Sequence, residues 1–456
     1  MMFKKIISGE SLAFFLPLLF ITSIYFLNNF SRNAFLERPA SFSSSDSVRI
    51  VLVFSIFLVF ILLISLLTPM VQNLRQVKLA WNFHLITYSF FILIPIFIDK
   101  YLGLNIMESL SKILRISYIN PIFADLNTIL TGIGCQTVNE IGDKITCDLE
   151  NNVFWNYPKV LLQFRIFNVD SKLTFVLGYF LALIFILVLA LFRDLNKIQK
   201  VILAFLAFSP PLLLVVNRGN FDLLILSSLT MAGYLMNRNL KFHLELSYLL
   251  VLFAASLKFY AFFALPLFLF FSRSKRNYFY FFVSTVGFLY FNFSDLRHLN
   301  QSIGRDMSGS FGLPVLLSHL NGYAESDLNF ISFGFVIILI LFIFYFNFFK
   351  QSFYKVNIGN YDDHVFLLLS FSFTITWLLA SNYYYRLVLL IFVIPFYFHK
   401  ESTRFENYIG LTCLISFYLS FRTFGFIMNI LLVPMIAFNF FILHRNLKRN
   451  FTNHGE

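Results

Sequence analysis

A few charged and polar residues lie beside long apolar segments, where a protein normally avoids them, and Asp125 is the first of these. It follows an amphipathic stretch, Ile106–Ile119, and has apolar neighbours on both sides. A carboxylate that is partly shielded from water becomes more basic, which suits a general base acting on an alcohol. The same carboxylate could instead cap a helix that begins at Leu126. Asp125 is therefore a candidate catalytic base with a structural alternative.

A second polar group follows in the same segment, beside Trp155. With Pro158 fixing the backbone, Asn156 and Tyr157 would form a rigid polar wall, and Lys159 would be available to bind a phosphate. Equally, Trp155 and Tyr157 fit the aromatic belt that membrane proteins place at the lipid–water interface. Both interpretations stay open.

A third group, Arg218, Asn220 and Asp222, joins two apolar segments within a few residues. Gly219 allows the chain to reverse tightly at this point. Arg218 and Asp222 are costly beside hydrocarbon unless they pair with each other or with a ligand. We expect these two side chains to form an ion pair, alongside any function that they have.

A lysine, Lys258, lies inside the apolar segment Leu244–Ser272, between two basic loops. A single membrane crossing would place one of these loops on the wrong side. A hairpin or broken helix with Lys258 near its outer apex removes the conflict, whereas one long tilted helix with a snorkelling lysine is the alternative. At a later turn, Tyr383 and Arg386 stand where the arginine could meet an anionic lipid headgroup.

The elements that must position these residues are membrane helices. Of the 456 residues 58% are hydrophobic and only 13% are charged, whereas about a quarter of a soluble domain is charged. Apolar runs such as Leu173–Phe192 reach the ~20 residues that cross a bilayer, and their uniform character indicates helices. We predict an all-α, polytopic integral membrane protein with about 13–14 spanning or half-spanning helices, forming a single membrane domain over residues 1–456.

The net charge of +12 comes from Lys and Arg spread over short loops, which indicates membrane topology rather than nucleic-acid binding. With the basic N-terminus inside, both termini face the cytoplasm. Two polar segments, Tyr101–Ser171 and Phe293–Asp327, are then large non-cytoplasmic loops that we expect to pack over the outer mouth. Cys135 and Cys147 share the first loop, where they would form a disulfide or stay reduced.

Taken together, these motifs resemble the GT-C-fold membrane glycosyltransferases that use polyprenyl-phosphate sugars, and most closely glycosyltransferase family 87. The order of the motifs and the sides on which their loops lie fit this family over most of the chain. The matching segments are Phe123-Ala124-Asp125, Asn156-Tyr157-Pro158, Arg218-Gly219-Asn220-Phe221-Asp222, Ser256-Leu257-Lys258-Phe259-Tyr260 and Asn382-Tyr383-Tyr384-Tyr385-Arg386.

The resemblance implies an inverting transfer of one sugar, for example a hexose such as mannose, from a polyprenyl-phosphate donor to a hydroxyl of a lipid-linked or cell-surface glycan acceptor. By the same analogy Asp125 deprotonates the acceptor, and Arg218, Lys258 and Arg386 hold the donor phosphate. The remaining residues that we assign to substrate binding are Asn156, Tyr157, Lys159, Asn220, Asp222 and Tyr383. We further expect a multi-pass protein of the bacterial inner membrane whose site faces the periplasm.

We expect no cofactor and no nucleic-acid partner. Metal dependence stays open, because Asp143 and Asp148 lie in the first outer loop. Two other functions are compatible with many spans and outer arginines: a surface-polysaccharide polymerase or ligase, and a transporter or flippase of lipid-linked sugars. A transporter would be favoured by an internal repeat, which the sequence does not show.

Overall fold

The part of the chain that the structure describes forms a helical bundle with two small pairs of strands. The computed structural model describes residues 92–111, 122–134, 138–147, 161, 171–302, 310–315, 361–399, 402–418 and 428–439, with short gaps inside several of these ranges. The predicted helical class is confirmed for this part of the chain. The predicted number of spans, the two loops as units and the Cys135–Cys147 disulfide depend on residues outside these ranges.

The strands form two antiparallel pairs. β1 (Val138–Ile141) pairs with β2 (Lys144–Cys147), and β3 (Ser310–Phe311) pairs with β4 (Asn382–Tyr383). The labelled helical elements are, in chain order, α6 (Ala124–Gly134), η2 (Ser171–Leu173), α7 (Thr174–Leu189), α8 (Lys197–Ala207), α9 (Pro210–Arg218), α10 (Asp222–Met236), α11 (His243–Leu257), η3 (Phe259–Leu267), α12 (Phe268–Phe271), α13 (Lys275–Ser302), α16 (Tyr361–Leu379), η4 (Tyr384–Leu390), η5 (Ile394–Phe398) and α17 (Arg404–Tyr418).

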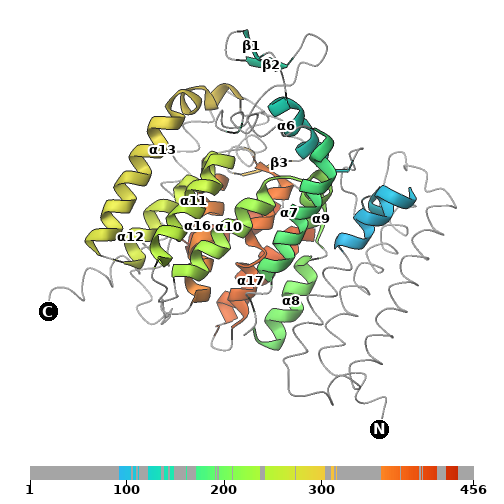
Figure 1. Cartoon of the computed structure of the whole chain (residues 1–456). Coiled ribbons are helices and arrows are strands. Elements are labelled where there is room, and N and C mark those ends of the chain that lie inside the picture. Colours follow the sequence, from blue (N-terminus) through green and yellow to red (C-terminus); the bar gives the residue numbers. More distant parts are fainter. Residues whose placement is uncertain are drawn as a thin grey trace, which may run out of the picture.

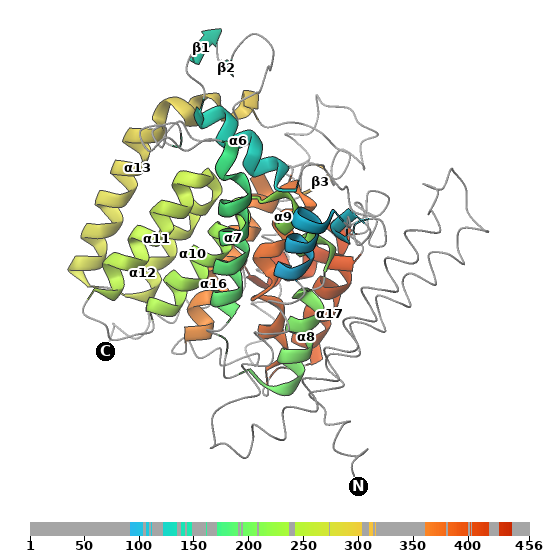
Figure 2. The same ribbon diagram turned by 45° about the vertical axis from the view of Figure 1, so that its right-hand side comes forward.

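Helix α10 lies at the centre of the bundle. It packs against α7, α11 and α16, and α6 lies across the top of the bundle in both views (Figures 1 and 2). A Cβ atom on Gly233 would lie only 2.8 Å from the backbone of Val365, so this glycine allows the backbones of α10 and α16 to approach closely. The end of α10 that carries Asp222 faces the same side as α6.

The segment between α11 and α12 reverses direction at Lys258. Tyr248 in α11 and Phe268 in α12 lie at equal sequence distances on either side of this lysine, yet their rings stack with 4.6 Å between centroids. This contact is impossible in one continuous helix, which would separate the two rings by many turns. The predicted hairpin with Lys258 at its apex is therefore confirmed.

Among the described residues, one helix is long and apolar enough to cross a membrane, Ser171–Leu189. A second candidate is the pair Ile198–Ala207 and Pro210–Arg218, which bends by 46° at a short break. Pro210 stands at the start of α9, the first-turn position where its missing N–H costs nothing. The other apolar helices in this part of the chain are shorter.

Apolar side chains also cover part of the outside of the bundle. On α13, Phe279, Phe282, Tyr290 and Phe291 are 62–79% exposed. A water-soluble monomer rarely exposes a run of large apolar side chains of this kind. This face of α13 is suited to lipid.

At the foot of the hairpin, buried Asn277 connects α11, α12 and α13. Its Nδ2 donates to the carbonyl oxygens of Phe268 and Ser272, and its Oδ1 accepts a bond of 2.8 Å from the hydroxyl of Tyr248. We expect Asn277→Ala to remove all three hydrogen bonds, to leave the Ser272 carbonyl without its amide donor, and to lower the free energy of unfolding by about 2 kcal/mol or more. Unfolding of the detergent-solubilised protein measures this loss.

Asn292 provides the matched control, because it is a buried asparagine on the same helix. Its Nδ2 donates only to the Phe288 carbonyl of its own helix, and its Oδ1 has no hydrogen-bond partner among the described residues. Asn292→Ala should therefore change the free energy of unfolding much less. Equal losses for the two variants would contradict the role given to Asn277.

Candidate functional site

The turn between α9 and α10 forms the floor of the site. Gly219 has φ +61°, the left-handed conformation that glycine adopts at little cost. Its N–H donates to the carbonyl of Val216 at 3.0 Å, and the N–H of Asn220 donates to the carbonyl of Val215 at 3.1 Å. These two bonds form a Schellman motif, which ends a helix while satisfying its last carbonyl groups. The tight reversal predicted at Gly219 is confirmed.

Asn220 then begins the next helix. Its side-chain Oδ1 accepts a bond of 3.1 Å from the backbone N–H of Asp222, which satisfies one of the free donors at the start of α10. The same Oδ1 accepts a bond of 2.7 Å from Nζ of Lys258. Because both donors address Oδ1, the amide orientation is settled, and Nδ2 must point the other way.

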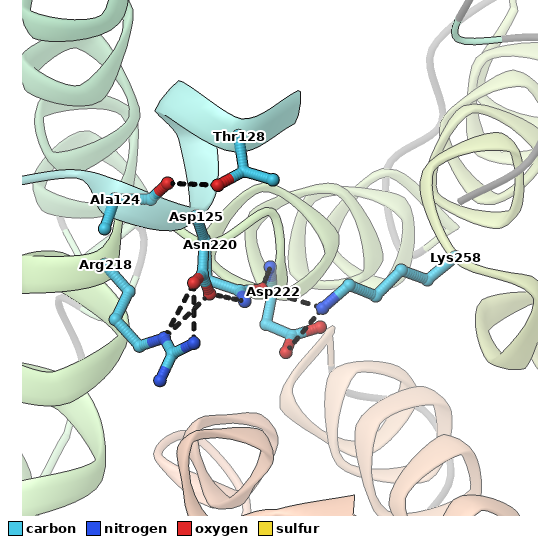
Figure 3. A network of polar contacts seen from close by, with 7 residues as sticks. All are labelled: Ala124, Asp125, Thr128, Arg218, Asn220, Asp222 and Lys258. Atoms are coloured by element: carbon cyan, nitrogen blue, oxygen red, sulfur yellow. Dashed lines mark hydrogen bonds and ion pairs between the residues drawn. The ribbon is translucent and has the colours of Figure 1, made fainter. Parts of the chain in front are cut away.

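Asp125 lies where Nδ2 of Asn220 points. It stands in the first turn of α6, and its Oδ2 accepts a bond of 2.7 Å from this amide (Figure 3). Nε of Arg218 donates to both carboxylate oxygens, at 2.9 and 2.8 Å, and Nη2 of Arg218 lies 2.7 Å from Oδ1. A guanidinium that addresses a carboxylate with two nitrogens holds it in a defined orientation.

Lys258 reaches the turn from the apex of the hairpin. Its Nζ lies 3.0 Å from Oδ2 of Asp222, whose other oxygen accepts a short hydrogen bond from the hydroxyl of Tyr260. Lys258 stands in the connection between α11 and η3, and burial lowers its pKa below the ordinary value while the Asp222 carboxylate raises it. The ion pair and the amide of Asn220 thus compensate for the burial of the ammonium group.

Arg386 joins the site from η4. Its guanidinium lies over the ring of Tyr260, 5.3 Å from the ring centroid, a cation–π contact. Nearby, the backbone of Tyr383 pairs with that of Ser310, so the turn before η4 lies beside a segment of the second polar stretch. Only the backbone of Tyr383 is described.

The structure brings together Asp125, Arg218, Asn220, Asp222 and Lys258 in one hydrogen-bonded network, with Arg386 attached through Tyr260. One prediction is wrong: Arg218 pairs with Asp125 and Asp222 pairs with Lys258, rather than Arg218 with Asp222. Asn156, Tyr157, Lys159 and Cys135, and the side chain of Cys147, lie outside the described residues.

Exposure divides the network into two layers. Asn220 and Asp222 are fully buried, whereas the side chains of Asp125 and Arg218 are 13% and 25% exposed. The outer pair can meet a ligand directly. Asn220 and Asp222 could influence a ligand only through Asp125 and Lys258, so their substrate-binding assignment stays a prediction.

Two residues of the site were not among the candidates from the sequence. Tyr260 has a signal that could have found it, because it lies two positions after Lys258 in the same motif. Phe123, which packs against Gly178 and Gly219, likewise lies in the same motif as Asp125, two positions before it, although nothing in the motif predicts its left-handed backbone. Within the described residues no group of three or more His, Cys, Asp or Glu side chains is arranged to hold a metal ion. Asp143 and Asp148 lie outside them.

The orientation of Asn220 can be tested by changing its amide to a carboxylate. We expect Asn220→Asp to place two carboxylates together at the contact that is now 2.7 Å long, and to lower the free energy of unfolding by about 1–3 kcal/mol at pH 8. Protonation of either carboxylate relieves the repulsion, so the loss should shrink as the pH falls and grow as it rises. Unfolding measured at pH 5 and pH 8 checks both parts.

The control is Asn220→Leu, which removes the same hydrogen bonds without adding a charge. Its stability loss relative to the original protein should depend little on pH over this range. A pH-independent loss in Asn220→Asp as well would mean that its new carboxylate does not face Asp125.

Comparison with known proteins gives one match. Residues 163–294 match the sequence model of glycosyltransferase family 87. No curated protein and no solved structure matches the chain. The matched segment contains Arg218, Asn220, Asp222 and Lys258, whereas Asp125 and Arg386 come from outside it. The resemblance seen in the motifs is thereby confirmed over residues 163–294, where this chain is similar to glycosyltransferase family 87.

Proposed function

We propose that this protein is an inverting membrane glycosyltransferase that moves one sugar, a hexose such as mannose, from a polyprenyl-phosphate donor to a hydroxyl of a lipid-linked or cell-surface acceptor. The family match supports glycosyl transfer. The observation that carries the proposal is the position of Asp125, a partly exposed carboxylate held by Arg218 and Asn220 at the end of the bundle where Lys258 and Arg386 also lie.

In the proposed reaction Asp125 takes the proton of the acceptor hydroxyl as its oxygen attacks the anomeric carbon. The bond between that carbon and the phosphate oxygen breaks, and the polyprenyl phosphate leaves with the bonding electrons. Attack from the face opposite the leaving group inverts the anomeric configuration in a single step. One well-placed base is sufficient for this chemistry.

The leaving group gains negative charge, so the reaction needs cations beside the donor phosphate. Arg218, Lys258 and Arg386 supply three formal positive charges against the two carboxylates of Asp125 and Asp222, which leaves a positive excess at this end of the bundle. Positive groups fixed in a poorly hydrated site stabilise a developing anion more than they would in water. Arginine adds a planar fork that matches phosphate oxygens.

The lipid donor requires access from a membrane. The apolar helices and the exposed aromatic face of α13 suit a protein embedded in lipid. Basic residues at the starts of α8 and α13 lie at the end of the bundle away from Lys258, the distribution expected when the site faces the periplasm of a bacterial inner membrane. We propose no cofactor for the reaction.

The base assignment is tested by Asp125→Asn. The amide keeps the size of the side chain but cannot accept the acceptor proton, so we expect transfer to fall about 100-fold or more with expression unchanged. Purified protein assayed against a panel of polyprenyl-phosphate sugars measures the loss and identifies the sugar. Normal transfer by this variant would remove Asp125 from the role of base.

Glu245→Gln is the matched carboxylate control. Glu245 pairs with Arg276 at the foot of the hairpin, far along α11 from Lys258. Losing this carboxylate should leave transfer nearly unchanged. A comparable loss in both variants would indicate damage to folding rather than removal of a base.

The donor-binding role of Arg386 is tested by Arg386→Ala. Loss of the guanidinium should raise the donor KM roughly tenfold, equivalent to ~1.4 kcal/mol of binding free energy. Arg386→Lys keeps the charge without the planar fork, so its donor KM should lie between those of the original protein and of Arg386→Ala. Steady-state kinetics with varied donor concentration measures both.

Arg276→Ala is the control for that series, because Arg276 is 53% exposed in its side chain and pairs with Glu245 at the opposite end of the hairpin. Its donor KM should match that of the original protein. An unchanged donor KM in Arg386→Ala would show that Arg386 does not bind the donor.

A further inference from the structure

We infer that Phe123 is a positioning residue that sets the place of Asp125 relative to Arg218 and Asn220. The inference rests on the proposed function, in which Asp125 is the base. Nothing about the residue type suggests this role, since Phe123 has no polar group on its side chain. The argument comes from its backbone and from what its ring contacts.

The backbone of Phe123 has an unusual conformation. Its φ is +66°, and it is the one non-glycine residue with positive φ among the described residues. A bulky side chain in this region crowds its own backbone, so such a residue is retained only where its surroundings enforce it. Here the N–H of Phe123 donates to the carbonyl of Asn217 at 2.7 Å. This bond connects the start of α6 to the residue just before Arg218.

The ring of Phe123 is fully buried and fills the space left by a glycine of α7. A Cβ atom on Gly178 would lie 2.3–2.6 Å from the ring, a distance that real atoms do not reach. A Cβ atom on Gly219 would lie 2.9 Å from Cβ of Phe123. Phe123 is therefore wedged between α7 and the α9–α10 turn.

These contacts act on both sides of Arg218. The backbone bond reaches Asn217, and the packing contact reaches Gly219, so the arginine lies between two points at which Phe123 holds the turn. Asp125 follows two residues later, in the first turn of α6. The N–H of Asn127 in the same turn donates to the Phe123 carbonyl at 2.8 Å, which ties this turn to Phe123. Displacement of Phe123 would change the distance from Asp125 to Arg218 and Asn220.

A pair of variants separates the backbone from the ring. Phe123→Gly and Phe123→Ala both remove the ring, but only glycine adopts φ near +66° freely. We expect the glycine variant to keep a kcat roughly fivefold or more above that of the alanine variant, with little difference in the donor KM. Glycine usually destabilises a protein more than alanine does, so a higher kcat in the glycine variant is the reverse of what general loss of stability would give. A kcat for alanine equal to or above that for glycine would overturn the inference.

Gly178→Ala tests the wedge without changing Phe123. The added methyl group should push the ring and lower kcat about tenfold or more with little change in the donor KM. Gly287→Ala adds a methyl group that meets nothing within 4 Å and should leave kcat unchanged. Gly233→Ala is a second control: its methyl group clashes with the backbone of Val365, at a place in the bundle away from the site. This variant shows how much a packing defect alone lowers kcat. A kcat in Gly178→Ala no lower than in Gly233→Ala would overturn the inference.

A readout that needs no enzyme activity distinguishes this inference from the proposed function. Asp125→Asn should lower the unfolding temperature in the original protein, and lower it less in the Gly178→Ala background, where the contact with Arg218 is already displaced. Equal effects in the two backgrounds would overturn the positioning role. Absence of transfer by the original protein from any donor would instead refute the proposed function and leave this comparison valid.

Discussion

The cost of burying charge is the constraint on which the rest of the site depends. Asp222 is fully buried and the side chain of Lys258 is only 10% exposed, so either would be strongly unfavourable without the other. Arg218 and Asp125 form a second pair nearer the surface. Asn220 connects the two pairs, donating to Asp125 and accepting from Lys258. A change at Asn220, Asp222 or Lys258 therefore leaves a buried polar group without a partner, so these three residues behave as a unit.

This network in turn depends on backbone geometry. Asp125 and Arg218 are 93 positions apart, and two left-handed residues bring them together. Gly219 reverses the chain so that Arg218 and Asn220 present their side chains to the same carboxylate. Phe123 holds the start of α6 against this turn by one backbone hydrogen bond and by its ring. The ion pairs are thus positioned by apolar packing, which does not weaken with salt.

The sequence is sufficient to find most members of the site but not their partners. Lys258 can be placed at an apex because basic loops on both sides require the chain to reverse. The pairing of Arg218 cannot be read in the same way. Asp222 is its near neighbour in sequence, and only the three-dimensional course of the Gly219 turn directs Arg218 to Asp125 and Asp222 to Lys258. The left-handed backbone of Phe123 is imposed by tertiary contacts, so its residue type carries no signal for it.

Asp125 faces two opposing requirements in the proposed reaction. Arg218 and Asn220 must hold its carboxylate in place, yet one of its oxygens must be free to take the proton of the acceptor hydroxyl. A donor phosphate competes for the same guanidinium. When Arg218 turns toward the phosphate, Asp125 keeps the bond from Asn220, whose orientation is set independently by Lys258 and the Asp222 N–H. Asp125 then keeps its position while Oδ1, which contacts Arg218, becomes free to accept a proton, so in the proposed reaction donor binding opens the base to the acceptor.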